Sequence, residues 1–356
     1  MRNNLLNRKN KKQLIKKLQS ETFDRKTCSF YRYVKINDVN ATRDQLFIEF
    51  NKLNILGRVY IATEGINAQV SIPIANWNSF INILNSYIEF ENIFINSAIQ
   101  NNNNSFIKLI VRIKDKIVAD GLKNEELDLS NTGNFLSASE FNMAMEKSDS
   151  IIVDIRNYYE SEVGHFDDAI CPDADTFKEL LPLVKNMLKG KEKNKLLLYC
   201  TGGIRCEKAS AYLKHNNFQD VNQLKGGIIS YVGQIKEKNL KNKFKGKNFV
   251  FDARMGENIT SDIISQCHQC NAPSNRHTNC NNQACHILFI QCKKCNIDLH
   301  GCCSKECHSI ANKSIEEQKE IRKKPLQAAP LRQYQKGTKP RLKDLIKQQS
   351  KSVKNI

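Results

Sequence analysis

Residues 196–206 read Leu-Leu-Leu-Tyr-Cys-Thr-Gly-Gly-Ile-Arg-Cys. The apolar run at the start predicts a buried parallel strand, and the pair Gly202 and Gly203 permits a tight turn after it. The residues from Glu207 onward favour a helix. A cysteine between the carboxyl end of a strand and the positive end of a helix lies where a thiolate is stabilised. The stretch therefore predicts an α/β fold that presents Cys200 as a nucleophile.

The residues around Cys200 indicate which chemistry this loop serves. Its backbone N–H groups and Arg205 favour anion binding, although a small buried cysteine that only packs is the alternative. Four residues separate Cys200 from Arg205, one fewer than in phosphatase loops of related architecture. The smaller ring suits one added atom on sulfur, as in a persulfide, better than a phosphoryl group. The loop is therefore of the rhodanese type, with Cys200, Gly202, Gly203 and Arg205 as candidate catalytic residues.

Two further segments resemble a rhodanese domain. Residues 150–169 contain Asp154 and Arg156 at the end of a strand, and then Gly164-His165 where we expect a turn. Residues 221–228 resemble the last strand of such a domain and the Gly-Gly turn before its closing helix. We therefore predict a rhodanese domain at 146–238, with a parallel sheet and the active loop at a strand's carboxyl end.

The whole chain resembles the bacterial tRNA uridine hydroxylases, a family that contains a rhodanese domain. The resemblance covers about residues 5–310 and rests on segments 42–46, 57–69, 116–121, 199–210 and 246–257. It implies an oxidoreductase that hydroxylates the wobble uridine, position 34 of tRNA, to 5-hydroxyuridine. It also implies O₂ as co-substrate and the anticodon arm as partner. A sulfurtransferase that passes persulfide sulfur to tRNA or protein is the alternative enzyme, and a non-catalytic RNA-binding or zinc adaptor protein is a third class.

Composition sets the bounds of these interpretations. The 356 residues carry a formal charge of +18 with a pI near 9.3, which fits a nucleic-acid partner, although the richness in Asn, Lys and Ile also fits a compositional bias. No apolar run is long enough for a membrane span, and the N-terminus lacks the apolar core of a signal peptide. An intact thiol nucleophile among 13 cysteines favours the cytoplasm. No flavin or nucleotide motif is found, and the sequence predicts no protein partner.

The N-terminal region predicts a ferredoxin-like, or acylphosphatase-like, domain at 26–120. Its expected β-α-β-β-α-β order has strands at 28–34, 59–62, 66–72 and 106–113, and helices at 43–53, capped by Thr42, and at 73–86. A basic extension, residues 1–25, precedes it. Such domains often bind RNA on a sheet face, and the aromatic candidates for stacking are Phe30, Tyr31, Tyr33 and Tyr60. The candidate RNA contacts are Arg58, Tyr60, Glu64, Asn67 and Arg112, and a plain turn at Glu64-Gly65 is an equally weighted alternative.

A cysteine-rich region at 245–310 predicts structural zinc. Two Cys-x-x-Cys pairs have the spacing of a zinc ribbon, and they give the first expected site: Cys267, Cys270, Cys292 and Cys295. A second site would draw on Cys280, Cys285, Cys302 and Cys307, with Cys303 or a histidine as further options. Disulfides and a redox sensor are the alternatives. Cys206 either packs against the sheet or resolves an oxidised Cys200, and residues 311–356 read as a basic flexible tail. The chain is therefore a multidomain α/β and α+β protein.

Overall fold

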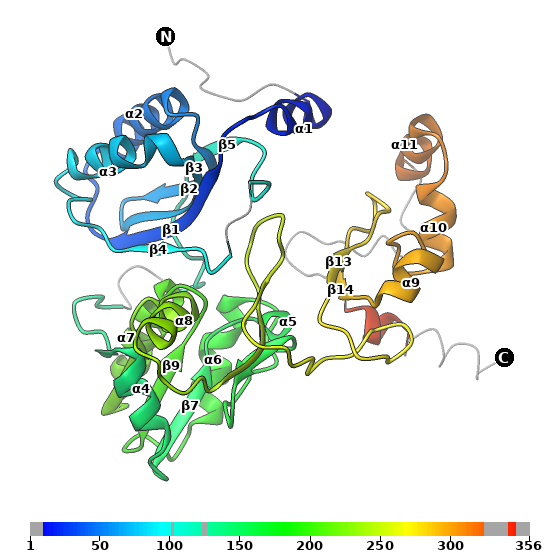
Figure 1. Cartoon of the computed structure of the whole chain (residues 1–356). Helices are drawn as coiled ribbons and strands as arrows, with labels where there is room; N and C mark the ends of the chain where they lie inside the picture. Colours follow the sequence, from blue (N-terminus) through cyan, green and yellow to red (C-terminus); the bar gives the residue numbers. More distant parts are fainter. Residues whose placement is uncertain (1–9, 101–102, 123–126, 324–340, 347–356) are drawn as a thin grey trace. The chain divides into compact units, whose positions relative to one another are not determined.

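The computed structural model describes residues 10–100, 103–122, 127–323 and 341–346. The chain divides into two compact units (Figure 1). The first comprises residues 1–157, 166–244 and 248–257, and the second comprises residues 158–165, 245–247 and 258–356. Cys200 therefore belongs to the first unit, and the cysteine-rich region from Cys267 to Cys307 belongs to the second.

The first unit begins with helix α1 (Lys11–Gln19) and a five-stranded sheet. The elements of the sheet and its helices are β1 (Arg25–Tyr33), α2 (Val39–Lys52), β2 (Leu56–Ala62), β3 (Gly65–Pro73), a 3-10 turn (Ile74–Asn76), α3 (Trp77–Asn85), β4 (Ile95–Ser97) and β5 (Leu109–Ile113). The strand order is β4-β1-β3-β2-β5. The first four of these strands pair antiparallel, and β5 is parallel to β2. The sheet thus has the predicted ferredoxin-like arrangement, with β5 added at one edge.

Two details differ from the expectation. The strand expected at 106–113 forms as β5, but the fourth strand of the β-α-β-β-α-β motif is β4, which has only three residues and no detectable periodicity. Helix α2 begins at Val39 because Asp38, and not Thr42, caps it. The Asp38 carboxylate accepts hydrogen bonds from the N–H groups of Asn40 and Ala41 at 3.0 and 2.9 Å, which satisfies donors that the helix leaves unpaired.

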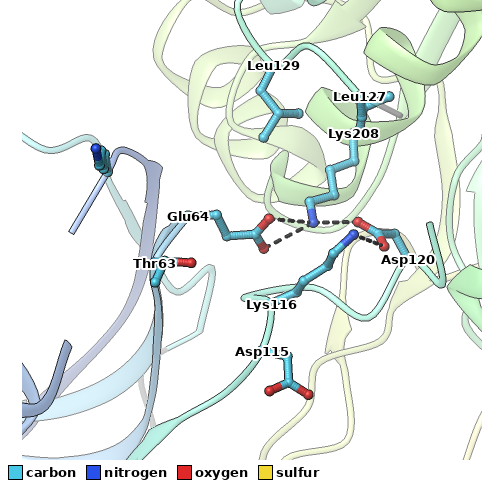
Figure 2. A pocket seen from close by; sticks show the side chains of 9 residues that line it. Thr63, Glu64, Asp115, Lys116, Asp120, Leu127, Leu129 and Lys208 are labelled. Carbon is cyan, nitrogen blue, oxygen red and sulfur yellow. Dashed lines mark hydrogen bonds and ion pairs between the residues drawn. The ribbon is translucent and has the colours of Figure 1, made fainter. Parts of the chain in front are cut away.

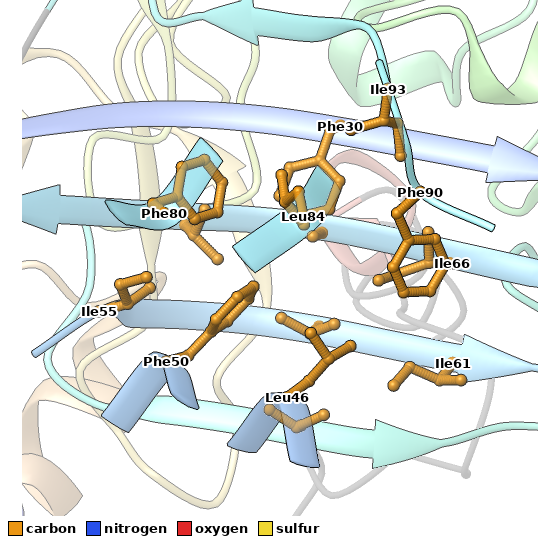
Figure 3. Close-up of a cluster of buried hydrophobic side chains, with 14 of the residues drawn as sticks. Phe30, Leu46, Phe50, Ile55, Ile61, Ile66, Phe80, Leu84, Phe90 and Ile93 are labelled. Carbon is orange, nitrogen blue, oxygen red and sulfur yellow. The ribbon is translucent and has the colours of Figure 1, made fainter. Parts of the chain in front are cut away.

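The core of this domain lies between one face of the sheet and helices α2 and α3 (Figure 3). Phe30 of β1 and Phe50 of α2 both pack against Phe80 of α3, with ring centroids 5.8 and 5.7 Å apart. Successive residues of a strand point to opposite faces. Neighbours of the core residues, such as Tyr31 and Tyr60, therefore lie on the face that the two helices leave uncovered.

The remainder of the first unit is built on a four-stranded sheet in the order β6-β10-β9-β7, in which every neighbouring pair is parallel. Its elements are β6 (Asn134–Leu136), α4 (Ala138–Met145), β7 (Ser150–Asp154), α6 (Phe177–Met187), β9 (Lys195–Tyr199), α7 (Ile204–His215), β10 (Asp220–Leu224) and α8 (Gly227–Glu237). This is the predicted parallel sheet. At the end of β7, the carboxylate of Asp154 pairs with Arg156 at 2.6 Å, and both side chains are buried.

The second unit contains the short helix α5 (Tyr158–Ser161), most of β8 (Gly164–Phe166) and most of β11 (Phe244–Asn248). Gly164-His165 lies in strand β8 and not in a turn as expected. A Cβ on Gly164 would lie 2.3 Å from the carbonyl oxygen of Lys247, so glycine is required by a close approach of the backbones. A three-stranded sheet in the order β12-β11-β8 includes β12 (Glu257–Asn258).

The cysteine-rich region of the second unit has little regular structure. It contains the hairpin of β13 (His277–Asn279) and β14 (Leu288–Ile290), followed by α9 (Lys293–Asp298), α10 (Lys305–Ala311) and α11 (Ile315–Lys323). Helix α11 and the buried side chains of Leu342 and Leu345 lie where a flexible tail was expected. Most other residues of that expected tail, and residues 1–9 of the expected N-terminal extension, lie outside the described residues.

Candidate active site

Cys200 lies directly after β9, in a loop that leads into α7. Gly203 precedes the helix with a φ of +101°, a conformation that other residues rarely adopt. Its N–H group donates a hydrogen bond to the sulfur of Cys200 at 3.2 Å. The structure thus has the strand, glycine loop and helix start that the sequence predicts around this cysteine.

A second glycine turn, Gly226-Gly227, holds the backbone of the loop. The N–H groups of Ile228 and Ile229 donate to the carbonyl oxygens of Cys200 and Thr201 at 2.9 and 3.2 Å. A Cβ on Gly227 would lie 2.4 Å from the Cys200 carbonyl oxygen, so no other residue fits without moving the loop. The sequence predicts this turn, but not its contact with Cys200.

The surroundings of Cys200 favour its thiolate. Burial by itself would raise its pKa, but a hydrogen bond from the Cys206 thiol, the charge of Arg205 and the N–H groups of Cys206 and Gly203 lower the pKa of Cys200 to about 6. Burial and the neighbouring Cys200 raise the pKa of Cys206 well above its usual value. Cys206 is packed in the core and remains a thiol that donates to the Cys200 sulfur. At neutral pH, Cys200 is therefore mainly a thiolate, the nucleophilic form of cysteine.

The uncovered face of the ferredoxin-like sheet contacts this loop. The Tyr33 hydroxyl donates to a carbonyl oxygen of α7 at 3.1 Å, and the Asn96 amide donates to the Gly202 carbonyl oxygen at 3.3 Å. The Tyr31 hydroxyl lies so near Gly203 that a Cβ there would be 2.7 Å from it. Tyr31 and Tyr33, which the sequence offers as base-stacking candidates, therefore pack against the cysteine loop. The site is built jointly by both domains of the first unit.

A half-buried carboxyl group, Glu207, is a site residue that local sequence patterns do not indicate. The Tyr31 hydroxyl donates to its carboxylate at 2.7 Å. Burial raises the pKa of Glu207, and the nearby charge of Cys200 adds to this effect, while the hydrogen bond from Tyr31 opposes it. A carboxyl with a raised pKa beside a thiolate can hold or accept a proton. From the sequence alone, Glu207 reads only as a helix-forming residue.

Glu64 belongs to a charged network around a cavity of about 330 Å³ (Figure 2). The ammonium of Lys208, on α7, lies 2.9 and 3.0 Å from the two oxygens of Glu64 and 2.5 Å from Asp120. Glu64 also accepts a hydrogen bond from the Ile117 N–H at 2.7 Å, and Lys116 pairs with Asp120 at 2.8 Å. The Glu64 carboxylate thus joins the two domains, and its side chain stays 20% exposed at the cavity.

The other candidate RNA contacts lie on the uncovered face of the sheet. In register, Tyr60 of β2 is flanked by Asn67 of β3 and Arg112 of β5. The Asn67 amide is engaged, because it accepts from Gln69 at 2.8 Å and donates to a backbone carbonyl at 3.1 Å. The guanidinium of Arg58 donates to a carbonyl oxygen at 3.1 Å while its side chain stays exposed. Arg58, Tyr60 and Arg112 remain accessible for a ligand.

Two groups of four cysteines in the second unit can each hold a metal ion. One is the predicted set Cys267, Cys270, Cys292 and Cys295, and the other is Cys280, Cys285, Cys303 and Cys307. Tetrahedral zinc with bonds of about 2.3 Å would place its sulfurs about 3.8 Å apart, and neighbouring sulfurs here lie 3.6 to 3.7 Å apart. The donor sets therefore fit zinc.

The second group corrects the expected ligands. Cys303 takes the place assigned to Cys302, and no histidine belongs to the group. The start of α10 explains this choice of ligand. Ser304 caps the helix, so that Cys303 just before it and Cys307 in its first turn lie four residues apart. The carbonyl oxygen of Cys302 instead accepts hydrogen bonds from Gln269 and Gln291. All 13 cysteines are free thiols, so the described residues contain no disulfide.

Comparisons with known proteins agree with this architecture. Residues 25–117 match the model of the UPF0176 acylphosphatase like domain, residues 137–234 match the rhodanese-like domain, and residues 245–308 match the rhodanese C-terminal region. A tRNA uridine(34) hydroxylase of Leptospira interrogans is 54% identical over 310 residues, which cover 87% of this chain and 84% of that protein. The chain belongs to the tRNA uridine(34) hydroxylase family.

Other members of the family are similarly close over their length. The proteins of the same name from Hamiltonella defensa and Yersinia enterocolitica are 46% and 45% identical over 88% of this chain and cover 89% and 90% of those proteins. No helix among the described residues has the length and apolar character of a membrane span. The tRNA uridine(34) hydroxylase family thus accounts for the acylphosphatase-like, rhodanese and cysteine-rich parts together.

Proposed function

We propose that this protein hydroxylates uridine 34 of tRNA to 5-hydroxyuridine, with Cys200 as the essential nucleophile and O₂ as co-substrate. The observation that carries the proposal is an intact Cys200 loop, with its thiolate-stabilising contacts, in a chain 54% identical to a protein named tRNA uridine(34) hydroxylase. The reaction takes place in the cytoplasm, where the cysteines stay reduced.

Each loop residue has a separate role. Cys200 is the reacting group, either as a thiolate or as a persulfide that has taken its outer sulfur from a donor persulfide. Gly202 and Gly203 leave the loop backbone open, so that N–H groups face the sulfur, and Arg205 supplies positive charge that stabilises an anion there. Glu207, bonded to Tyr31 at 2.7 Å, is placed to exchange a proton near this sulfur.

The remaining parts bind and support the RNA. The ferredoxin-like domain, 26–120, contacts the anticodon arm through its uncovered face, next to the rhodanese domain at 146–238. The region 245–310 is held by structural zinc at both cysteine groups. Zinc has no redox chemistry, so these ions stabilise the fold and do not activate O₂.

The test is mass spectrometry of tRNA nucleosides from cells that lack this protein, complemented with wild type or with Cys200→Ser. We expect 5-hydroxyuridine and its derivatives to return only with wild type. Cys206→Ser is the matched control, because it changes a neighbouring thiol that donates to Cys200, and it should retain part of the activity. A return of 5-hydroxyuridine with Cys200→Ser would overturn the assignment. A change confined to a thiolated nucleoside would indicate a sulfurtransferase instead.

A further inference from the structure

The segment after β11 exposes one aromatic side chain on a firmly held loop. Arg254 pairs with Asp252 at 2.6 Å and with Glu257 at 2.5 Å, and all three side chains are at most 9% exposed. Arg254 also donates to the Gln100 carbonyl oxygen at 2.8 Å. In contrast, Phe251 remains 44% exposed. Single exposed rings are common on protein surfaces, so the neighbours of Phe251 decide whether it belongs to a binding site.

Phe251 lies between the cysteine loop and the uncovered face of the ferredoxin-like sheet. The guanidinium carbon of Arg205 lies 5.8 Å from the centroid of the Phe251 ring. On its other side, Arg58 of β2 donates to the Phe251 carbonyl oxygen at 3.1 Å. Phe251 therefore links Arg205 of the active loop to Arg58 on the sheet face.

The sheet face continues this surface with positive charge and a second aromatic ring. Tyr60 lies opposite Arg112 in register, and the Lys114 ammonium lies 5.8 Å from the centroid of the Tyr60 ring. Neither β2 nor β5 contains an acidic residue. Arginines and lysines interleaved with aromatic rings are the pattern that binds single-stranded RNA, because phosphates pair with the cations and bases stack on the rings.

We infer that Phe251 is the platform on which the uracil base of nucleotide 34 stacks beside the Cys200 loop, with Arg58 and Arg112 contacting the phosphates that follow. The inference rests on the proposed function and adds the residue that positions the base. An anticodon base must leave its neighbours before a buried cysteine can reach it, and a ring beside the loop replaces the stacking it loses.

The test measures the affinity of an anticodon stem-loop RNA and of the same RNA with an abasic nucleotide at position 34. For wild type, removal of the base should weaken binding about 5- to 150-fold, the range of a base–aromatic stack. Phe251→Leu keeps the apolar volume but removes the ring, and it should bind both RNAs equally. Phe251→Tyr keeps the ring and should behave as wild type.

Phe23→Leu is the matched control. Phe23 is 40% exposed and has an arginine 5.3 Å from its ring, but it precedes β1, at the end of that strand far from Tyr31. It should discriminate the two RNAs as wild type does. If Phe251→Leu still discriminates them, the inference is wrong.

The failure of the inference can be separated from failure of the proposed function. If wild type produces 5-hydroxyuridine at position 34 but binds both RNAs equally, or if Phe251→Leu still discriminates, only the stacking role is overturned. If wild type neither produces the modified nucleoside nor distinguishes the RNAs, both are overturned.

Discussion

Replacement of Lys208 by methionine is a direct test of the charged network between the two domains of the first unit. The substitution removes the ammonium and keeps most of the apolar stem. Lys208 is 1% exposed and contacts both oxygens of Glu64 and one oxygen of Asp120. Without it, the Asp120 carboxylate, also 1% exposed, retains Lys116 as its only cation among the described residues.

The expected loss of stability follows from these burials. Breaking a buried ion pair from one side costs about 3–5 kcal/mol, because the other charge stays desolvated. Two features place Lys208→Met at the low end of that range. Lys116 still pairs with Asp120 at 2.8 Å, and the Glu64 side chain is 20% exposed and regains water. We therefore expect a loss of about 3 kcal/mol.

Urea unfolding followed by tryptophan fluorescence measures this loss. Trp77, the single tryptophan of the chain, lies in α3 of the same unit. Lys195→Met is the matched control, because the Lys195–Asp220 pair has a similar distance of 2.7 Å but side chains 26% and 38% exposed, and should cost about 0–1 kcal/mol. Adding Asp120→Asn to Lys208→Met should recover part of the loss. Equal, small effects of Lys208→Met and Lys195→Met would mean that burial of the Lys208 network adds no stability.

Three further predictions follow from the site and the metal groups. Alkylation of Cys200 should accelerate as pH rises through about 6, since the thiol predominates below this pH and the thiolate above it. Peptide mass spectrometry measures the rate, and Cys206→Ala should move the midpoint to higher pH. A wild-type midpoint near the ordinary cysteine value of about 8.5 would contradict this prediction. Protein purified under reducing conditions should hold two zinc ions by elemental analysis. The Cys303→Ser variant should hold one ion, and the Cys302→Ser variant should keep both. Loss of zinc from Cys302→Ser alone would reverse the ligand assignment. The affinity for the anticodon stem-loop should fall steeply with salt, and Arg112→Gln should reduce the logarithmic slope by about 0.7; an unchanged slope would remove Arg112 from the phosphate contacts.

The parts of the fold that follow from local patterns are readable in the sequence. The apolar run before Cys200, the two glycines and the helix formers after them predict β9, the loop and α7 without tertiary information. Strand β4 is not predictable in the same way. It has three residues, Ile95–Ser97, and it exists because β1 offers it an edge.

Site residues whose partners lie far away in the sequence cannot be predicted from local patterns. The turn at Glu64 is visible as a turn, but the role of its carboxylate depends on Lys208, which lies 144 residues away. The same applies to Glu207, whose partner Tyr31 lies on another domain. The choice between Cys302 and Cys303 depends on where α10 begins, which adjacent cysteines do not reveal. Phe251 has no periodicity of its own, and only its exposure and its arginine neighbours indicate a role.

We propose above that this protein, with Cys200 as the essential nucleophile, transfers one oxygen atom of O₂ to uridine 34, while a two-electron donor reduces the other atom to water. The most direct measurement uses cells whose only copy of this protein is the complementing wild type. The cells are grown under isotopically labelled O₂, and their tRNA nucleosides are analysed by mass spectrometry. We expect one labelled oxygen in the 5-hydroxyuridine made by wild type, and no 5-hydroxyuridine when Cys200→Ser replaces it. Unlabelled 5-hydroxyuridine, or a gain of sulfur in place of oxygen, would contradict it.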